Sequence, residues 1–186
     1  MKSALIVIDV QQSFTARPYW SDREVPQFVD RLNRLIDRAE SAGIPVLQVF
    51  HVEGEEVPEN PFSRASGLVR TLDDVRVRPE ETFYKSVHSA MFASTSRGQT
   101  LDNWLRLNGI ERVIITGIRT EQCCETTTRH ASDLGYQVTY AIDATLTFEM
   151  QASSGKVYSA SDIRERTELV LAGRFAEVMP AEAVAL

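Results

Sequence analysis

The sequence predicts a three-layer α/β/α fold, in which a mainly parallel, Rossmann-like sheet is covered by helices on both faces. The chain begins with a continuous apolar run, as expected for a strand buried on both faces. Further apolar runs alternate with segments in which apolar residues recur at helical spacing. Strands separated by helices form parallel sheets with right-handed crossovers, which gives the predicted fold class.

The first half of the chain holds two of the predicted strands. Residues 4–10 form the first strand, with Asp9 near its end, and residues 27–42 have the apolar spacing of a helix. A second strand is expected at 45–52. Residues 53–82 are rich in Glu, Pro, Arg and Ser and show little periodicity, so they predict a long excursion that lines a site or a partner surface.

The second half continues the alternation. We expect helices at 96–107, 121–134 and 161–172, and strands at 112–117, 137–142 and 176–179. Active sites in such sheets gather at the carboxyl ends of the strands.

Composition limits the possible functions. A chain of 186 residues with 43% hydrophobic content predicts one domain over residues 1–186. The net charge of −6 is spread along the chain without a Lys/Arg block, which argues against nucleic acid as a partner. No apolar stretch approaches the ~20 residues that cross a bilayer, and no signal peptide is evident. We therefore expect a cytoplasmic protein that acts on a small molecule, without a membrane partner.

The only two cysteines, Cys123 and Cys124, are adjacent in the chain. Bridging neighbours is strained, so no disulfide framework is expected. Cys123 lies at the start of a predicted helix, where the macrodipole is expected to lower the pKa of its thiol. A lone cysteine is more often a small buried hydrophobe. Cys124 points about 100° away around the helix, so we assign it to the core.

Asp9 closes the first predicted strand, and Lys85 follows the segment 81–84, where a further strand end is expected. A carboxylate within an apolar run must lose its charge or find partners. Asp9 could equally cap a loop or pair with an arginine, and most lysines are surface groups. Lys85 therefore gains meaning only if the fold brings it to Asp9 and Cys123.

Three ordered segments carry a resemblance to a known family. They are 6–14 (IVIDVQQSF), 84–92 (YKSVHSAMF) and 117–131 (GIRTEQCCETTTRHA). Together they resemble the isochorismatase-like cysteine hydrolases, which include nicotinamidases and N-carbamoylsarcosine amidohydrolase. The pairs Gly135-Tyr136 and Asp143-Ala144 also match the family pattern.

The resemblance implies an isochorismatase-like hydrolase fold and a catalytic set of Asp9 as general base, Lys85, and Cys123 as nucleophile. It further implies a cis peptide between Ile118 and Arg119, and an oxyanion hole formed by the backbone N–H groups of Arg119 and Cys123. The implied reaction is hydrolysis of a small amide, ureide or lactam C–N bond through a thioester. Family members are usually dimers or tetramers, so a homo-oligomer is expected.

One departure bears on cofactors. Nicotinamidases bind a metal through an Asp-x-His segment, whereas this chain reads Val49-Phe50-His51 and lacks the Asp. A lone histidine is more often a hydrogen-bonded core or rim residue than a ligand. We therefore expect no metal and no other cofactor, and we disfavour nicotinamide as the substrate.

The pocket residues follow from proximity to these motifs. Arg119 and His51 could favour an anionic or strongly hydrogen-bonding substrate, although Arg119 could equally pair outward with Glu121 or Glu125. The expected substrate-pocket residues are Gln11, Phe14, Trp20, His51 and Phe148.

Three other functions stay open. True isochorismatases cleave a vinyl ether and typically do not need the cysteine, so Cys123 favours acyl transfer. A non-catalytic binding or assembly module could retain the same fold. For a catalytic Cys123, fast iodoacetamide labelling near neutral pH is expected. A thiol redox protein is the weakest option, because redox pairs prefer a Cys-x-x-Cys spacing.

Overall fold

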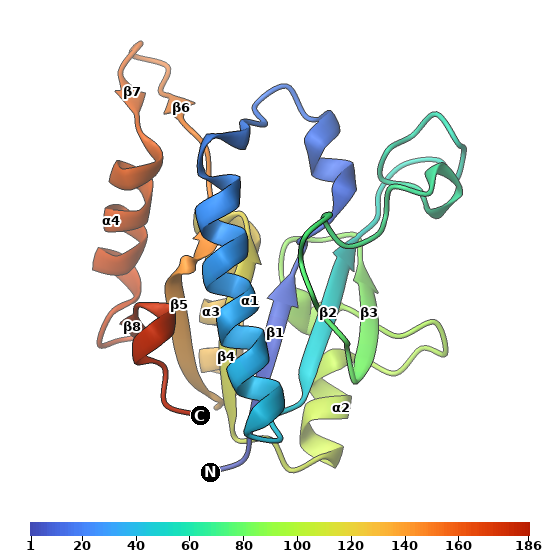
Figure 1. Ribbon diagram of the computed structural model, residues 1–186, viewed down its shortest axis with the longest axis vertical. Coiled ribbons are helices and arrows are strands. Elements are labelled where there is room, and N and C mark those ends of the chain that lie inside the picture. Colours follow the sequence, from blue (N-terminus) through green and yellow to red (C-terminus); the bar gives the residue numbers. More distant parts are fainter.

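The computed structural model describes residues 1–186, and its centre is a six-stranded sheet with all neighbouring strands parallel (Figure 1). The spatial order is β3-β2-β1-β4-β5-β8. The strands are β1 (Ser3–Ile8), β2 (Val46–His51), β3 (Glu81–Lys85), β4 (Arg112–Ile118), β5 (Gln137–Leu146) and β8 (Glu177–Met179). The parallel sheet predicted from the sequence is confirmed.

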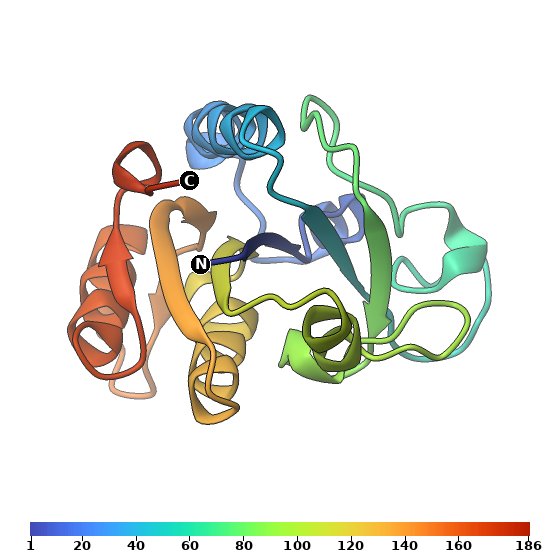
Figure 2. The ribbon, with the colours of Figure 1, turned by 90° about the horizontal axis from the view of Figure 1, so that it is seen from below.

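Helices cover both faces of this sheet (Figure 2). Helix α1 (Val25–Ser41) lies on one face, and α2 (Leu101–Leu107), α3 (Glu125–Asp133) and α4 (Ala160–Leu171) lie on the other. Alternate residues of β1 supply the two apolar layers, because successive side chains of a strand point to opposite faces. Leu5 and Val7 pack in the cluster that contains α1, and Ile6 and Ile8 pack in the other. The three-layer fold class is therefore also confirmed.

Several predicted boundaries were wrong. The helix expected at 96–107 begins only at Leu101, because the preceding residues form a turn in which Thr95 N–H donates to the Gln99 carbonyl. The side chain of Thr100 then caps the helix by accepting from the backbone N–H of Asn103. The helix expected at 121–134 opens with a π-helical turn, Thr120–Cys124, before α3 begins.

Strand β5 is longer than predicted and is irregular. It continues to Leu146, and its pairing with β4 shifts register between Ile115 and Gly117. A small antiparallel hairpin of β6 (Met150–Gln151) and β7 (Val157–Tyr158) was not predicted. In Figure 1 this hairpin projects beyond the carboxyl ends of the strands.

The excursion between β2 and β3 folds back over the end of β1. The backbone N–H groups of Gln12 and Ser13 donate to the carbonyls of Arg70 and Leu68, at 2.9 and 3.0 Å. The backbone N–H of Leu72 donates to the Val10 carbonyl at 3.2 Å. These bonds place the excursion beside the segment that follows Asp9, at the edge where the strands end.

None of the helices has the length and apolar character needed to traverse a lipid bilayer. The single domain over 1–186, the homo-oligomer and the cytoplasmic location stay predictions.

Candidate active site

The carboxyl ends of three strands bring Asp9, Lys85 and Cys123 into one buried cluster. Asp9 directly follows β1, Lys85 ends β3, and Cys123 lies in the turn after β4. The Nζ atom of Lys85 is 2.7 Å from Asp9 Oδ2 and 3.6 Å from Cys123 Sγ. The three residues are only 0%, 3% and 6% exposed, respectively. The structure thus joins the three residues that the sequence motifs singled out.

Asp9 has an unusual backbone and one free carboxylate oxygen. Its φ of 55° lies in the left-handed region, which is uncommon for a residue other than glycine and is often found at functional sites. The backbone holds this conformation through bonds from Asp9 N–H to the Val49 carbonyl and from Gln11 N–H to the Asp9 carbonyl. Lys85 occupies Oδ2, whereas Oδ1 is buried without a hydrogen-bond partner. Oδ1 is therefore available to accept a proton.

Hydrogen bonds fix the turn that carries Cys123. The hydroxyl of Thr127 donates to the Cys123 carbonyl at 2.6 Å and accepts from the Ala90 N–H at 2.9 Å. The hydroxyl of Tyr140 donates to the Thr120 carbonyl at 2.7 Å. These bonds tie the turn that carries Cys123 to the segment after Lys85 and to β5.

The peptide between Ile118 and Arg119 is cis, as the family pattern implied. The backbone N–H of Arg119 donates to no acceptor within the protein. The Arg119 carbonyl instead accepts from the N–H groups of Gln122 and Cys124, both at 3.2 Å. The Arg119 N–H is thus free for a ligand, as an oxyanion-hole donor must be.

The helix start does not lower the pKa of Cys123, so that expectation was wrong. Burial raises the pKa of the Cys123 thiol well above its ordinary value, and the Asp9 carboxylate raises it further; the Lys85 ammonium offsets only part of this. Burial opposes the charge of Lys85, but Asp9 and Cys123 more than compensate and raise the pKa of Lys85. The resting site is therefore a neutral thiol beside an ion pair.

His51 joins this ion pair to a second one. Its Nδ1 lies 3.3 Å from Lys85 Nζ, and its Nε2 lies 3.2 Å from Glu53 Oε2. An ammonium can only donate, so Nδ1 accepts and Nε2 carries the proton that Glu53 accepts. Arg17 also pairs with Glu53. Burial and the neighbouring Lys85 lower the pKa of His51, which keeps the imidazole neutral.

The residues around His51 do not fit a metal site. Both ring nitrogens are engaged, one by an ammonium and one by Glu53. No three or more His, Cys, Asp or Glu side chains are grouped so that they could hold an ion. A cation is already present at this position in the form of Lys85.

The predicted pocket residues divide into two groups. Gln11 is buried, and its amide bridges to β2: Oε1 accepts from the His51 N–H at 2.7 Å and Nε2 donates to the His51 carbonyl at 2.9 Å. Phe14 is also buried and packs edge-on against Phe62, with ring centroids 5.1 Å apart. Trp20 and Phe148 contact one another, with ring centroids 5.1 Å apart.

Arg119 turns inward, and its partner is Glu121. Its Nη2 lies 2.8 Å from Glu121 Oε1, and its guanidinium carbon lies 4.5 Å from the centre of the Tyr19 ring and 5.8 Å from that of Phe148. Of the two outward pairings considered from sequence, Glu125 is excluded because it binds Arg129 and Arg166.

The family that the motifs suggested is confirmed by comparison with known proteins. The isochorismatase domain family matches residues 3–179 of the chain. The chain belongs to the isochorismatase family of hydrolases.

Relatives in this family include proteins of different names. The chain is 28% identical to the uncharacterized isochorismatase family protein YrdC of Bacillus subtilis, over 96% of this chain and 91% of that protein. It is 28% identical to the nicotinamidase of Escherichia coli, over 87% of this chain and 97% of the enzyme. The structure of an isochorismatase from Pseudomonas putida superposes with a TM-score of 0.81 and 26% identity, over 98% of this chain and 90% of that one.

Four side chains at the site of this isochorismatase-family hydrolase were missed from sequence: Arg17, Tyr19, Glu53 and Glu121. Glu53 opens the excursion, and Arg17 and Tyr19 follow the first motif in a stretch without periodicity. The adjacent aromatics Tyr19 and Trp20, in an otherwise polar stretch, were the one available signal. Glu121 was weighed only as an outward partner of Arg119.

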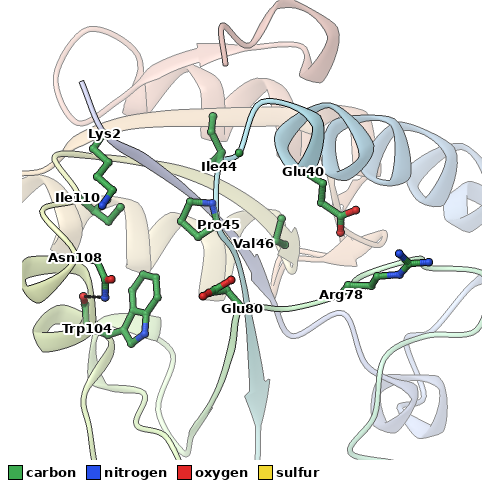
Figure 3. Close-up of a pocket in the computed structure, with 11 residues that line it drawn as sticks. Lys2, Glu40, Ile44, Pro45, Val46, Arg78, Glu80, Trp104, Asn108 and Ile110 are labelled. Carbon is green, nitrogen blue, oxygen red and sulfur yellow. Dashed lines mark hydrogen bonds between the residues drawn. The ribbon is translucent and has the colours of Figure 1, made fainter.

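A separate pocket lies at the amino ends of the strands, at the opposite end of the sheet from Asp9 and Lys85 (Figure 3). It has a volume of about 410 Å³ and includes Lys2, Val46 and Trp104, from the amino ends of β1 and β2 and from α2. Charges of both signs line it, from Arg78 and Glu80 among others. The pocket lies away from the family motifs, and ligands of parallel sheets bind at the other edge.

Proposed function

We propose that this isochorismatase-family hydrolase cleaves the C–N bond of a small amide, ureide or lactam through a thioester on Cys123. The observation that carries the proposal is a neutral buried thiol beside a carboxylate that has one oxygen held by Lys85 and the other unpartnered. That arrangement supplies a nucleophile, a base and a cation paired with the base.

In the first half of the reaction, Asp9 Oδ1 accepts the proton of Cys123 Sγ as the sulfur forms a bond to the substrate carbonyl carbon. The developing oxyanion is bound by the backbone N–H groups of Arg119 and Cys123. The C–N bond then breaks, and Asp9 delivers its proton to the departing nitrogen. An amine and a thioester result.

In the second half, water attacks the thioester carbonyl. Asp9 accepts a proton from this water and returns it to the Cys123 sulfur as the C–S bond breaks. A carboxylic or carbamic acid leaves. Lys85 stays protonated throughout, because its raised pKa keeps it cationic beside Asp9.

The relative named nicotinamidase supports an amide bond as the target, whereas the isochorismatase from Pseudomonas putida supports the alternative of vinyl-ether hydrolysis. A vinyl ether offers no acyl group for a thiolate to hold. The thiol beside Asp9 and Lys85 therefore favours acyl transfer.

The test is a hydrolysis screen over small amides, carbamoyl compounds and lactams with wild type, Cys123→Ala and Cys124→Ala. We expect hydrolytic activity in wild type. We also expect it in Cys124→Ala, because Cys124 is a core residue. Cys123→Ala should lose it. Turnover by Cys123→Ala would support the vinyl-ether or another thiol-independent reaction, and the absence of activity in every protein would favour a binding module.

A further inference from the structure

The catalytic cluster is enclosed by the protein around it. The side chains of Asp9 and Lys85 have no exposed surface, and Cys123 is only 6% exposed. A substrate carbonyl must come within bonding distance of the Cys123 sulfur and within hydrogen-bond distance of the Arg119 N–H. Part of the enclosing wall must therefore move before a substrate can react.

A short segment beside the cluster, residues 17–21 (RPYWS), is free to make such a movement; we call it the strap. Figure 1 shows the connection that contains it arching from β1 to α1, beyond the carboxyl end of β1. The backbone of the strap makes only two hydrogen bonds, both within residues 14–20. Before the strap, the N–H of Ser13 is bonded to the excursion, and after it Glu24 pairs with Arg164 of α4 at 2.7 Å. The strap can therefore move while both of its ends stay in place.

Side chains alone hold the strap against the rest of the protein. At one end, Arg17 pairs with Glu53 and stacks on Phe62, with its guanidinium carbon 4.0 Å from the ring centre. Further along, Tyr19 packs against Phe148, with ring centroids 5.3 Å apart. Arg17 and Glu53 are 36% and 43% exposed, and ion pairs with such access to water are weak. A few weak contacts thus keep the strap closed.

Tyr19 borders both the catalytic cluster and a surface pocket. Its ring centre lies 4.5 Å from the guanidinium carbon of Arg119. Burial raises the pKa of Tyr19, Arg119 and Arg17 oppose this, and Cys123 lies close enough to add to the rise. On its other side, Tyr19 lines a pocket of about 450 Å³ together with Phe148. Displacement of Tyr19 would therefore connect this pocket with Cys123.

We propose that the strap is a gate between the surface pocket and Cys123. It opens when Arg17 leaves Glu53 and Phe62 and Tyr19 leaves Phe148, and a small molecule then passes from the pocket to the sulfur. Its return encloses that molecule before the chemical step. The gate controls access to Cys123 whatever bond the thiol attacks, so it goes beyond the proposed hydrolysis.

The rates at which iodoacetamide labels the two cysteines test the gate without a substrate. Arg17→Gln removes the ion pair and the stacking, and it should accelerate labelling of Cys123 by about five- to tenfold. Loss of a nearby cation favours the protonated thiol, so a faster rate reports access and not a lower pKa. Cys124 is fully enclosed in the core, and its rate should not change. Arg23→Gln, an exposed arginine without an ion pair, is the matched control and should leave both rates as in wild type.

Tryptic digestion places both cysteines in the peptide 120–129, whose fragment ions give the label on each. An unchanged Cys123 rate in Arg17→Gln would overturn the gate, as would wild-type labelling as fast as that of glutathione. Equal acceleration of Cys124 would also overturn it, because global unfolding would then expose both thiols. Tyr19→Ala, which removes the contact with Phe148, is the second variant if Arg17→Gln does not fold, and it should accelerate Cys123 alone. The hydrolysis screen tests the reaction separately.

Discussion

Cys123 and Cys124 are neighbours in the chain and are both buried, but their surroundings differ. Cys123 lies 3.6 Å from the Lys85 ammonium and beside Asp9, whereas Cys124 is fully enclosed in the core. Motif spacing selected Cys123 correctly as the residue that meets Asp9 and Lys85. The raised pKa of its thiol could not be read from the helix start, because it comes from burial by segments distant in sequence.

The fast iodoacetamide labelling expected from the helix-start position of Cys123 is therefore replaced by the opposite prediction, which is that labelling is slow in the free protein. The thiol is only slightly exposed and stays protonated near neutral pH, since burial and Asp9 raise its pKa. Mass spectrometry at pH 7 should show a rate below that of glutathione, with Cys123→Ala reporting the background from Cys124. Labelling faster than glutathione would contradict the protonated resting thiol.

Asp9→Asn should abolish the base while preserving the shape of the site. We expect kcat to fall by about 10² to 10⁴, the usual contribution of a general base. Folding should weaken by roughly 3 to 5 kcal/mol, because Lys85 is left buried without its carboxylate. Steady-state kinetics and urea unfolding measure the two effects, and Asp37→Asn, on the exposed face of α1, is the control. Unchanged turnover would rule out Asp9 as the base.

His51 should make the protein less stable in acid. Its pKa is lowered by burial and by Lys85, so the unfolded chain takes up a proton near pH 6.5 while the folded protein stays neutral. The free energy of unfolding should therefore decrease as pH falls from 7 to 5. Burial raises the pKa of Glu53, but Arg17 and His51 together lower it by more. Glu53 therefore contributes little to the loss of stability above pH 4.5.

Urea unfolding of His51→Gln at pH 7 and 5 checks this, since the glutamine variant should lose less stability between the two. An equal loss in both proteins would mean that His51 is protonated in the folded state. The change should also lower turnover, because His51 Nδ1 then no longer positions the Lys85 ammonium.

At the scale of the elements, Gly117 fixes the approach of β4 to β1. It has a φ of 125°, and a Cβ placed there would lie 1.9 Å from the Ile8 carbonyl oxygen. Its register partner is Ile8, the residue before Asp9, so strand spacing here controls the site directly. Because the clash would be with the backbone of Ile8, no side chain could move aside to relieve it.

Gly117→Ala should destabilise the fold by about 3 kcal/mol or more and reduce activity. Gly43→Ala is the matched control, because Gly43 also has a positive φ, 70°, but open space around its Cβ position. It should cost only about 1 kcal/mol, the intrinsic penalty of the left-handed region. Equal losses of unfolding free energy in denaturant would refute the steric explanation.

Most of the order of strands and helices was predictable, because buried parallel strands and amphipathic helices carry distinct apolar patterns; the edge strand β3 was not delimited, because it follows a segment without periodicity. Boundaries set by tertiary contacts were not predictable. Strand β5 was expected to end before Asp143, but the Asp143 carboxylate accepts from the Ala181 N–H at 2.6 Å and the strand continues past it. Helix α2 starts late because Thr95 and Thr100 form a turn and a cap within a stretch of helical spacing.

For the molecule as a whole, the motifs predicted which strand ends meet at the site. They did not predict which side chains from irregular segments lie beside it. Asp9, Lys85 and Cys123 lie at strand ends, where the topology of a parallel sheet determines proximity. Arg17 and Glu53 come from irregular segments whose positions depend on long-range packing. The ion pairs of these segments therefore became visible only in the folded structure.

Alkaline pH should destabilise the folded protein. Unfolded Cys123 loses its proton near pH 9.0, whereas burial keeps the folded thiol protonated to higher pH. Above pH 9 the native state binds more protons than the unfolded chain, so the free energy of unfolding falls by about 1.4 kcal/mol per pH unit for this group. Lys85 adds to the loss above pH 10.5, because Asp9 and Cys123 outweigh burial and raise its pKa.

Urea unfolding at pH 8, 9 and 10 measures this slope. Cys123→Ala removes the titrating thiol and should show a shallower decrease than wild type. Parallel curves for the two proteins would mean that the folded thiol titrates at its ordinary pKa.

The most direct test of the whole account is intact-protein mass spectrometry of the acyl intermediate. Wild type is mixed with the best substrate from the screen, quenched in acid within one turnover, and digested to locate any adduct. The account predicts the mass of the acyl group on Cys123, its disappearance on longer incubation, and no adduct in Cys123→Ala. An adduct on Cys124, or full turnover by Cys123→Ala, would contradict it.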